Sequence, residues 1–123
     1  MGKTVLIVDD SNTMRKIVSR ALRQAGIDFD TILEAGDGQE ALTVLADNKV
    51  DVVLSDINMP NMNGLEFLKA KSENAAIKDI PVVMISTETG ADIIDEAKSY
   101  GAKGAIKKPF TPELINETLG ALL

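Results

Sequence analysis

Short runs of consecutive apolar residues alternate, five times along the chain, with segments in which apolar residues recur at helical spacing. The runs are too short to be helices, and because they are apolar at successive positions they predict strands buried on both faces. Strands of that kind occur in parallel sheets with helices on each side. The chain is therefore expected to adopt an α/β fold, a three-layer αβα sandwich with five parallel strands and five helices. The predicted strands are Val5–Val8, a weaker Thr31–Ala35, Val52–Leu54, Pro81–Ile85 and Ala105–Ile106.

The predicted helices begin or end at residues that are favoured in those places. Asn, Asp and Thr are common directly before a first turn, proline is common inside it, and glycine is common after a last turn. These residues place each helix between two predicted strands or after the last one. They are Gly26 after the first helix, Asp37 with Glu40 before the second, Asn63-Gly64 at the third, Gly101 after the fourth and Thr111-Pro112-Glu113 at the fifth.

The residue types that the chain lacks exclude several functions. It has no cysteine and no histidine, which excludes disulfides, zinc sites with thiolate or imidazole ligands, and imidazole general bases. A net charge of −6 argues against nucleic-acid binding, because phosphate contacts need a basic surface. No apolar run approaches the roughly 20 residues of a membrane span. The 123 residues are therefore expected to form one cytoplasmic domain, residues 1–123, with no membrane contact.

The candidate functional residues directly follow the predicted strands. Asp9 and Asp10 come after the first strand, Asp56 after the third, Ser86 after the fourth and Lys108 after the fifth. Ligands of open parallel sheets bind at the carboxyl ends of the strands, so these side chains are expected to meet at one edge. Taken singly, each also has a structural explanation, since acids and serine favour helix N-termini and a surface lysine is usually solvated.

Taken together, these residues indicate a site for magnesium and a phosphoryl group. Carboxylates about 4 Å apart repel by about 4 kcal/mol per pair at an effective dielectric near 20, so a bound cation is expected among them. Carboxylate and carbonyl oxygens suit Mg²⁺, which often binds beside a phosphate. Asp56, at the end of the central strand, is the candidate nucleophile, with Lys108 and Ser86 stabilising the transferred group. The chain has neither of the glycine-rich loops that bind nucleotide phosphates, so a nucleotide donor is not expected.

These residues and their surroundings resemble the response-regulator receiver domain, and the resemblance covers the whole chain. Within that family the stretch from Asn58 to Met62 is especially similar to single-domain, CheY-like chemotaxis regulators. The resemblance implies the flavodoxin-like strand order 2-1-3-4-5. The stretches that carry it are VLIVDDSNTMRKIV, EAGDGQEAL, DVVLSDINMPNMNGLEFL, IPVVMIS and KKPFTPELI.

The resemblance also assigns roles in the site. It makes Asp56 the residue that becomes 4-aspartylphosphate, and it implies Mg²⁺, for which Mn²⁺ can substitute. The metal ligands would be Asp10, the Asp56 side chain and the Asn58 backbone carbonyl, with Asp9 adding charge and a contact through water.

Further roles fall on residues around the phosphoryl group. Ser86 corresponds to the switch hydroxyl of the family and Lys108 to its active-site lysine. The Lys108-Pro109 bond is expected to be cis. Asn58 and Glu88 would flank the phosphoryl group and tune its hydrolysis.

One position departs from the family pattern. Receivers usually have an aromatic residue three positions before the site lysine, and it turns inward when the hydroxyl closes on the phosphate. Here that position is Ala105, so the coupled aromatic switch is in doubt. Tyr100 is expected to pack at the end of the fourth helix rather than to replace the missing aromatic. Lys103 and Lys107 are expected on the surface formed by the fourth helix, the fifth strand and the fifth helix.

The sequence therefore predicts a stand-alone, monomeric response regulator without an output domain. A sensor histidine kinase, or a small donor such as acetyl phosphate, would phosphorylate Asp56. The phosphorylated form would bind an output protein, such as the flagellar motor switch or another chemotaxis component. A phosphate sink and a phosphorelay intermediate remain open alternatives. An aspartate-nucleophile phosphatase is disfavoured because Asn58 stands where those enzymes have a second acid, and a flavin binder because Asp9 and Asp10 would repel its phosphate.

Overall fold

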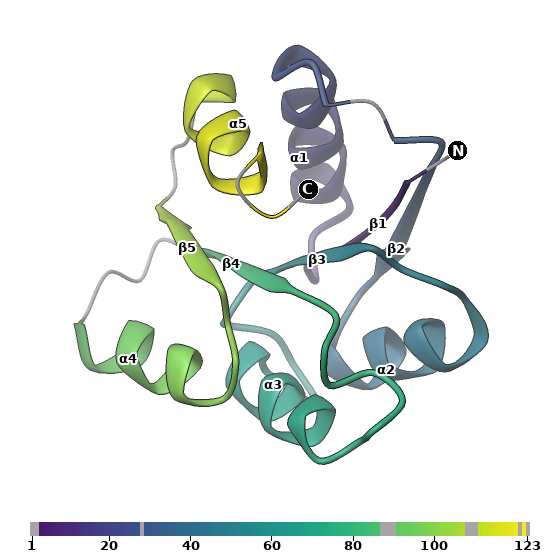
Figure 1. The fold of residues 1–123 in the computed structure, drawn as a ribbon, viewed down its shortest axis with the longest axis vertical. Coiled ribbons are helices and arrows are strands. Elements are labelled where there is room, and N and C mark those ends of the chain that lie inside the picture. The colour runs from purple at the N-terminus through teal and green to yellow at the C-terminus, as the bar shows by residue number, and fades with distance from the viewer. Residues whose placement is uncertain (1–2, 28, 87–90, 108–110, 121, 123) are drawn as a thin grey trace.

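A computed structural model describes residues 3–27, 29–86, 91–107, 111–120 and 122. Its described residues form one parallel sheet of five strands in the order β2-β1-β3-β4-β5, with helices on both faces (Figure 1). The predicted fold class and strand order are confirmed. The elements in chain order are β1 (Thr4–Val8), α1 (Asn12–Gln24), β2 (Thr31–Ala35), α2 (Gly38–Asp47), β3 (Val52–Ser55), α3 (Gly64–Ser72), β4 (Val82–Ser86), α4 (Ala91–Ser99), β5 (Gly104–Lys107) and α5 (Pro112–Gly120).

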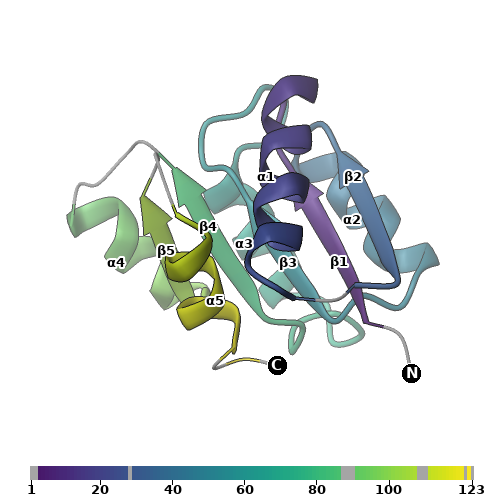
Figure 2. The same cartoon turned by 90° about the horizontal axis from the view of Figure 1, so that it is seen from above.

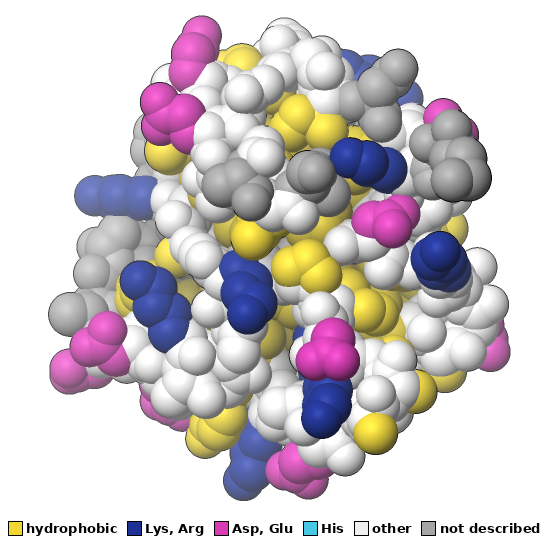
Figure 3. All heavy atoms as spheres, in the orientation of Figure 1, with side chains coloured by type: hydrophobic (Ala, Val, Ile, Leu, Met, Phe, Trp, Pro, Cys, Tyr) yellow, Lys and Arg dark blue, Asp and Glu magenta, His cyan; other side chains and the backbone are white. Residues whose placement is uncertain are grey.

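The continuous apolar runs of the strands supply two separate cores. Successive strand residues point to opposite faces of the sheet, so every second residue belongs to the same core. In β1, for example, Val5 and Ile7 pack beneath α1 and α5, whereas Leu6 and Val8 pack beneath α2, α3 and α4. Figure 2 shows this division, with α1 and α5 on one side of the sheet and the other three helices opposite. In Figure 3, apolar side chains gather in the middle of the face shown, with charged side chains around them.

The capping residues inferred from the sequence make the expected hydrogen bonds. The Asp37 side chain accepts from the Glu40 amide at 2.9 Å, and Thr111 Oγ1 accepts from the Leu114 amide at 3.2 Å. Asn63 and Glu66 form a complete capping box at the start of α3. These caps satisfy amides that have no partner inside the helix, and they fix where α2, α3 and α5 begin. No helix in the described ranges is long and apolar enough to cross a bilayer.

Candidate functional site

The register of the central strands brings the predicted acids to one edge of the sheet. Val8 at the end of β1 pairs with Ser55 at the end of β3, and the Asp56 amide donates to the Val8 carbonyl at 2.8 Å. Asp9 continues β1 by donating its amide to the Ala35 carbonyl at 3.1 Å. Asp9 and Asp56 therefore leave neighbouring parallel strands at the same level, as the strand pattern predicts.

Asp9, Asp10 and Asp56 form a compact group, called here the acidic group. Each can present a carboxylate oxygen within 4.8 Å of those of the other two. Burial is graded: Asp9 is buried, Asp56 is half-buried and Asp10 is exposed. The carboxylates of Asp9 and Asp56 accept hydrogen bonds from the amides of Ser11 at 2.9 Å and Ile57 at 2.7 Å. Oxygen ligands held by the backbone, next to one open to solvent, fit a cation such as Mg²⁺ that keeps several waters.

Asn58 lies on the β3–α3 loop, residues 57–63, two positions after Asp56. Its side chain is exposed. At the end of the loop, Gly64 donates its amide to the Ile57 carbonyl at 2.8 Å. A Cβ atom on Gly64 would lie 2.4 Å from the Asp56 carbonyl oxygen, so only glycine fits there. The sequence marked Gly64 as a helix start but did not show that it closes the loop against the nucleophile candidate.

Arg15 is a residue near the site that the sequence pattern did not single out. Its Nε lies 2.9 Å from Glu34 Oε1, an ion pair between α1 and β2. The same guanidinium donates to the Asp9 carbonyl and to Asn12 Oδ1. Arg15 thus holds the backbone of Asp9 and the start of α1 in place. From sequence alone it is one of several cations on a helix, because its partner Glu34 lies 19 positions away.

Several predicted site residues lie outside the part that the structure describes. They are Glu88, Lys108 with the following Pro109, and the side chain of Ser86, although the Ser86 backbone ends β4. Ala105 is exposed on β5 and pairs with Met84. Tyr100 packs against the core beneath α4, as predicted. Lys103 and Lys107 are both exposed.

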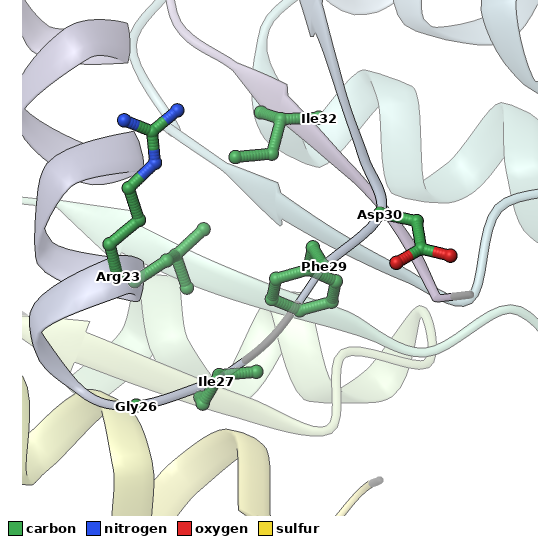
Figure 4. A pocket seen from close by; sticks show the side chains of 7 residues that line it. Arg23, Gly26, Ile27, Phe29, Asp30 and Ile32 are labelled. Atoms are coloured by element: carbon green, nitrogen blue, oxygen red, sulfur yellow. The ribbon is translucent and has the colours of Figure 1, made fainter. Parts of the chain in front are cut away.

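A hollow of about 510 Å³ lies at the other end of the sheet, between the last turn of α1 and the start of β2. Ile27, Phe29 and Ile32 give it apolar walls, with Arg23 and Asp30 at its border (Figure 4). It shares no residue with the acidic group. The hollow is therefore separate from the candidate metal site.

Comparisons with known proteins agree with this geometry. The family model described as the response regulator receiver domain matches residues 5–120. The chain is 41% identical over 120 residues to a chemotaxis protein CheY homolog of Campylobacter jejuni, covering 97% of this chain and 91% of that protein. It is also 41% identical over 122 residues to chemotaxis protein CheY1 of Helicobacter pylori, covering 97% and 95%.

Solved structures give the same picture. The structure of Vibrio cholerae chemotaxis protein CheY4 superposes with a TM-score of 0.88 at 41% identity, covering 100% of both chains. A CheX-CheY-BeF₃-Mg²⁺ complex from Borrelia burgdorferi contains a chain that superposes with a TM-score of 0.86 at 29% identity. That match covers 98% of this chain and 88% of the other.

Proposed function

The chain belongs to the family of response regulator receiver domains, and from this premise we propose that it accepts a phosphoryl group on Asp56 in a Mg²⁺-dependent reaction. Phosphorylation would then change its affinity for a protein partner in chemotaxis signalling. The observation that carries the proposal is the acidic group, in which carboxylate oxygens from two adjacent strand ends come within 4.8 Å of one another.

Asp56 is the proposed nucleophile because it follows the central strand β3 and is half-buried. One oxygen of its carboxylate would form a bond to phosphorus while the bond from phosphorus to the donor breaks. That broken bond is phosphorus–nitrogen for a phosphohistidine and phosphorus–oxygen for acetyl phosphate. The Ile57 amide, which donates to Asp56 Oδ1 at 2.7 Å, orients the carboxylate for this attack. Ser86 and Lys108 keep their proposed roles as donors to the phosphoryl oxygens.

Asp10, Asp56 and the Asn58 carbonyl are the proposed ligands of Mg²⁺, with Asp9 next to them. When bound, the metal would neutralise charge on both the carboxylates and the phosphoryl group. Asp9 is buried and its side chain accepts a hydrogen bond from the Ser11 amide, so its position beside the site is fixed. Oxygen-only ligand sets also accept Mn²⁺, which is the proposed substitute. Asn58 and Glu88 remain the residues proposed to tune hydrolysis.

The proposed partners follow from the relatives. Two relatives are named chemotaxis proteins, and a structural neighbour is a CheY chain in complex with CheX. A sensor histidine kinase is the proposed donor, and a motor-switch or other chemotaxis protein is the proposed output partner, both in the cytoplasm. The chemotaxis relatives are matched over 91% and 95% of their own lengths, which supports a regulator of one domain, residues 1–123. That it acts as a monomer is part of the proposal.

No enzymatic turnover is proposed beyond phosphotransfer to Asp56 and its autodephosphorylation. Incubation with phosphomonoesters should release no phosphate catalytically, which would separate a receiver from a phosphatase. A phosphate sink or a phosphorelay intermediate would show the same labelling but no activation-dependent partner. Capture with the beryllofluoride-activated protein, compared with an Asp56→Asn control, separates these roles by whether activation recruits a motor or chemotaxis protein.

The decisive experiment is labelling with acetyl phosphate followed by intact-protein mass spectrometry. Wild-type protein should gain one phosphoryl group in Mg²⁺ and none in excess chelator. Asp56→Asn should gain none under either condition, whereas Asp51→Asn, which changes an acid before β3, should label like wild type. Labelling of Asp56→Asn to the wild-type level would refute the assignment of Asp56.

A further inference from the structure

The β3–α3 loop, which carries the proposed metal ligand Asn58, contains a strained turn. Asn61 has a φ of +63°, a left-handed conformation that non-glycine residues seldom adopt, although Asn tolerates it better than most. The Met62 amide donates to the Pro60 carbonyl at 2.6 Å, closing a three-residue turn around Asn61. Such a conformation costs free energy and persists only where surrounding contacts hold it.

Those contacts come from the N-terminus of α2, an element that contributes nothing to the acidic group. Asn61 Nδ2 donates to Asp37 Oδ2 at 3.0 Å, and the Gly38 amide donates to the Met62 carbonyl at 2.9 Å. The hydrogen bond from Asn61, together with that from the Glu40 amide, holds the pKa of Asp37 below its ordinary value. Asp37 thus uses one oxygen to cap α2 and the other to hold the loop.

The packing at Gly38 leaves no space for a side chain. A Cβ atom there would lie 2.6 Å from Met62 Cγ and 2.9 Å from the Met62 carbonyl oxygen. The carbonyl is backbone and cannot rotate away as a side chain would. The backbone of α2 therefore lies directly against the backbone of the loop, and this contact requires glycine at position 38.

The loop is consequently held at two places on either side of Asn58. At its base, Gly64 binds Ile57 and lies against the Asp56 carbonyl. At its outer end, Asn61 and Met62 bind Asp37 and Gly38. Among the described residues, hydrogen bonds from residues 58–62 to another helix or strand terminus run only through this outer contact.

We propose that Asp37 and Gly38 are positioning residues that hold the β3–α3 loop in the conformation in which the Asn58 carbonyl reaches Mg²⁺. The inference rests on the proposed function, because it concerns the same metal site. A free loop would have to be ordered each time the metal binds, and that ordering would reduce the affinity. The affinity for Mg²⁺ would then depend on residues at the start of α2 that do not touch the metal.

Two variants separate this role from the stability of α2. Gly38→Ala inserts the forbidden Cβ but improves helix propensity, so α2 itself is not weakened. Asp37→Ser keeps a favoured N-cap but removes the second oxygen that binds Asn61. The matched control is Gly36→Ala, whose Cβ would meet only ends of flexible side chains, Glu40 Oε2 at 3.3 Å and Arg15 Nη1 at 3.9 Å.

The test is isothermal titration calorimetry with MgCl₂ on each full-length variant, after circular dichroism has established folding in chelator. Residues that orient metal ligands typically change affinity by 10- to 100-fold, and a loop contact should do less, so Gly38→Ala should raise the Kd for Mg²⁺ by about threefold to tenfold. Asp37→Ser should raise it by about twofold to threefold, and Gly36→Ala should leave it at the wild-type value.

The outcomes distinguish the inference from the proposed function. If folded Gly38→Ala and Asp37→Ser both bind Mg²⁺ with the wild-type Kd, the positioning role is wrong while the metal site stands. If Gly38→Ala does not fold, the Kd of Asp37→Ser for Mg²⁺ tests the positioning role by itself. A raised Kd supports the role and a wild-type Kd overturns it. If the wild-type protein binds no Mg²⁺ at all, the proposed function fails first. An equal loss of affinity in Gly36→Ala would also overturn the inference, because the effect would not be specific to the loop contact.

Discussion

The acidic group and Lys71 both keep charge partly away from bulk water, but their surroundings differ. Asp9, Asp10 and Asp56 are three like charges within reach of one another. Lys71 on α3 is 4% exposed, and its ammonium donates to the Lys78 carbonyl at 3.0 Å. A single buried ammonium that donates to a backbone carbonyl has its hydrogen bond within the protein and does not need a ligand. A cluster of carboxylates needs positive charge beside it, from a cationic side chain, a bound metal ion or both, which is why the first region is a candidate metal site and the second is not.

The largest expected effect is on the response of stability to Mg²⁺. At a Mg²⁺ concentration 100 times Kd, binding to the folded state alone should add about 2.7 kcal/mol to the free energy of unfolding. Asp10→Ala should lose this gain in thermal melts, and without metal it should be at least as stable as wild type because a repulsion is gone. A wild-type Mg²⁺ response in Asp10→Ala would show that the acidic group is not the metal site.

The next effect concerns Lys71, where replacement should help rather than harm. Burial lowers the pKa of Lys71 to about 8 from its ordinary value of 10.5, and nearby Lys103 lowers it further while Asp79 opposes the shift. Holding the charged form in that environment costs stability at neutral pH. Lys71→Met should therefore raise the free energy of unfolding at pH 7 by about 1 kcal/mol, measured by urea denaturation.

The pH dependence of stability gives an independent check on Lys71. Between pH 8 and pH 10.5 the unfolded chain still holds the Lys71 proton that the folded protein has released, given its lowered pKa. The unfolded state then binds more protons, so the contribution of Lys71 to stability rises with pH through this window and is constant below it. Lys71→Met should remove that rise, whereas Lys69→Met, at an exposed position on the same helix, should retain it.

The smallest effects should come from the two charges beside Lys71, and they should be opposite in sign. Asp79→Asn should lower the pKa of Lys71 further, because it removes the charge that favours the ammonium. Lys103→Gln should raise that pKa, because it removes a like charge. Titration of the Lys71 side chain by NMR measures both. Shifts of the same sign in the two variants would contradict the opposite effects assigned to Asp79 and Lys103 on the pKa of Lys71.

The acidic group could be predicted from sequence, but Lys71 and the contact between α2 and the β3–α3 loop were not. Strand ends are local features, and parallel strands bring their ends to the same edge whatever lies between them. Lys71 does lie four residues after Phe67, on the buried stripe of α3, so the helical period carried a signal for it. The contact of Asp37 with Asn61 spans 24 positions, and no periodic pattern links residues that far apart.

The sequence by itself determined the α/β class, the helix caps and the acids at the strand ends, because those depend on the apolar period and on side chains acting on nearby backbone. The tertiary structure decided which glycines matter. Gly38 and Gly64 cannot carry a Cβ because backbone from another part of the chain lies against them, whereas Gly26 and Gly101 meet nothing within 4 Å and instead have a positive φ. The reason is physical: close approach between backbones depends on how elements pack, and a residue's identity does not reveal its neighbours in space.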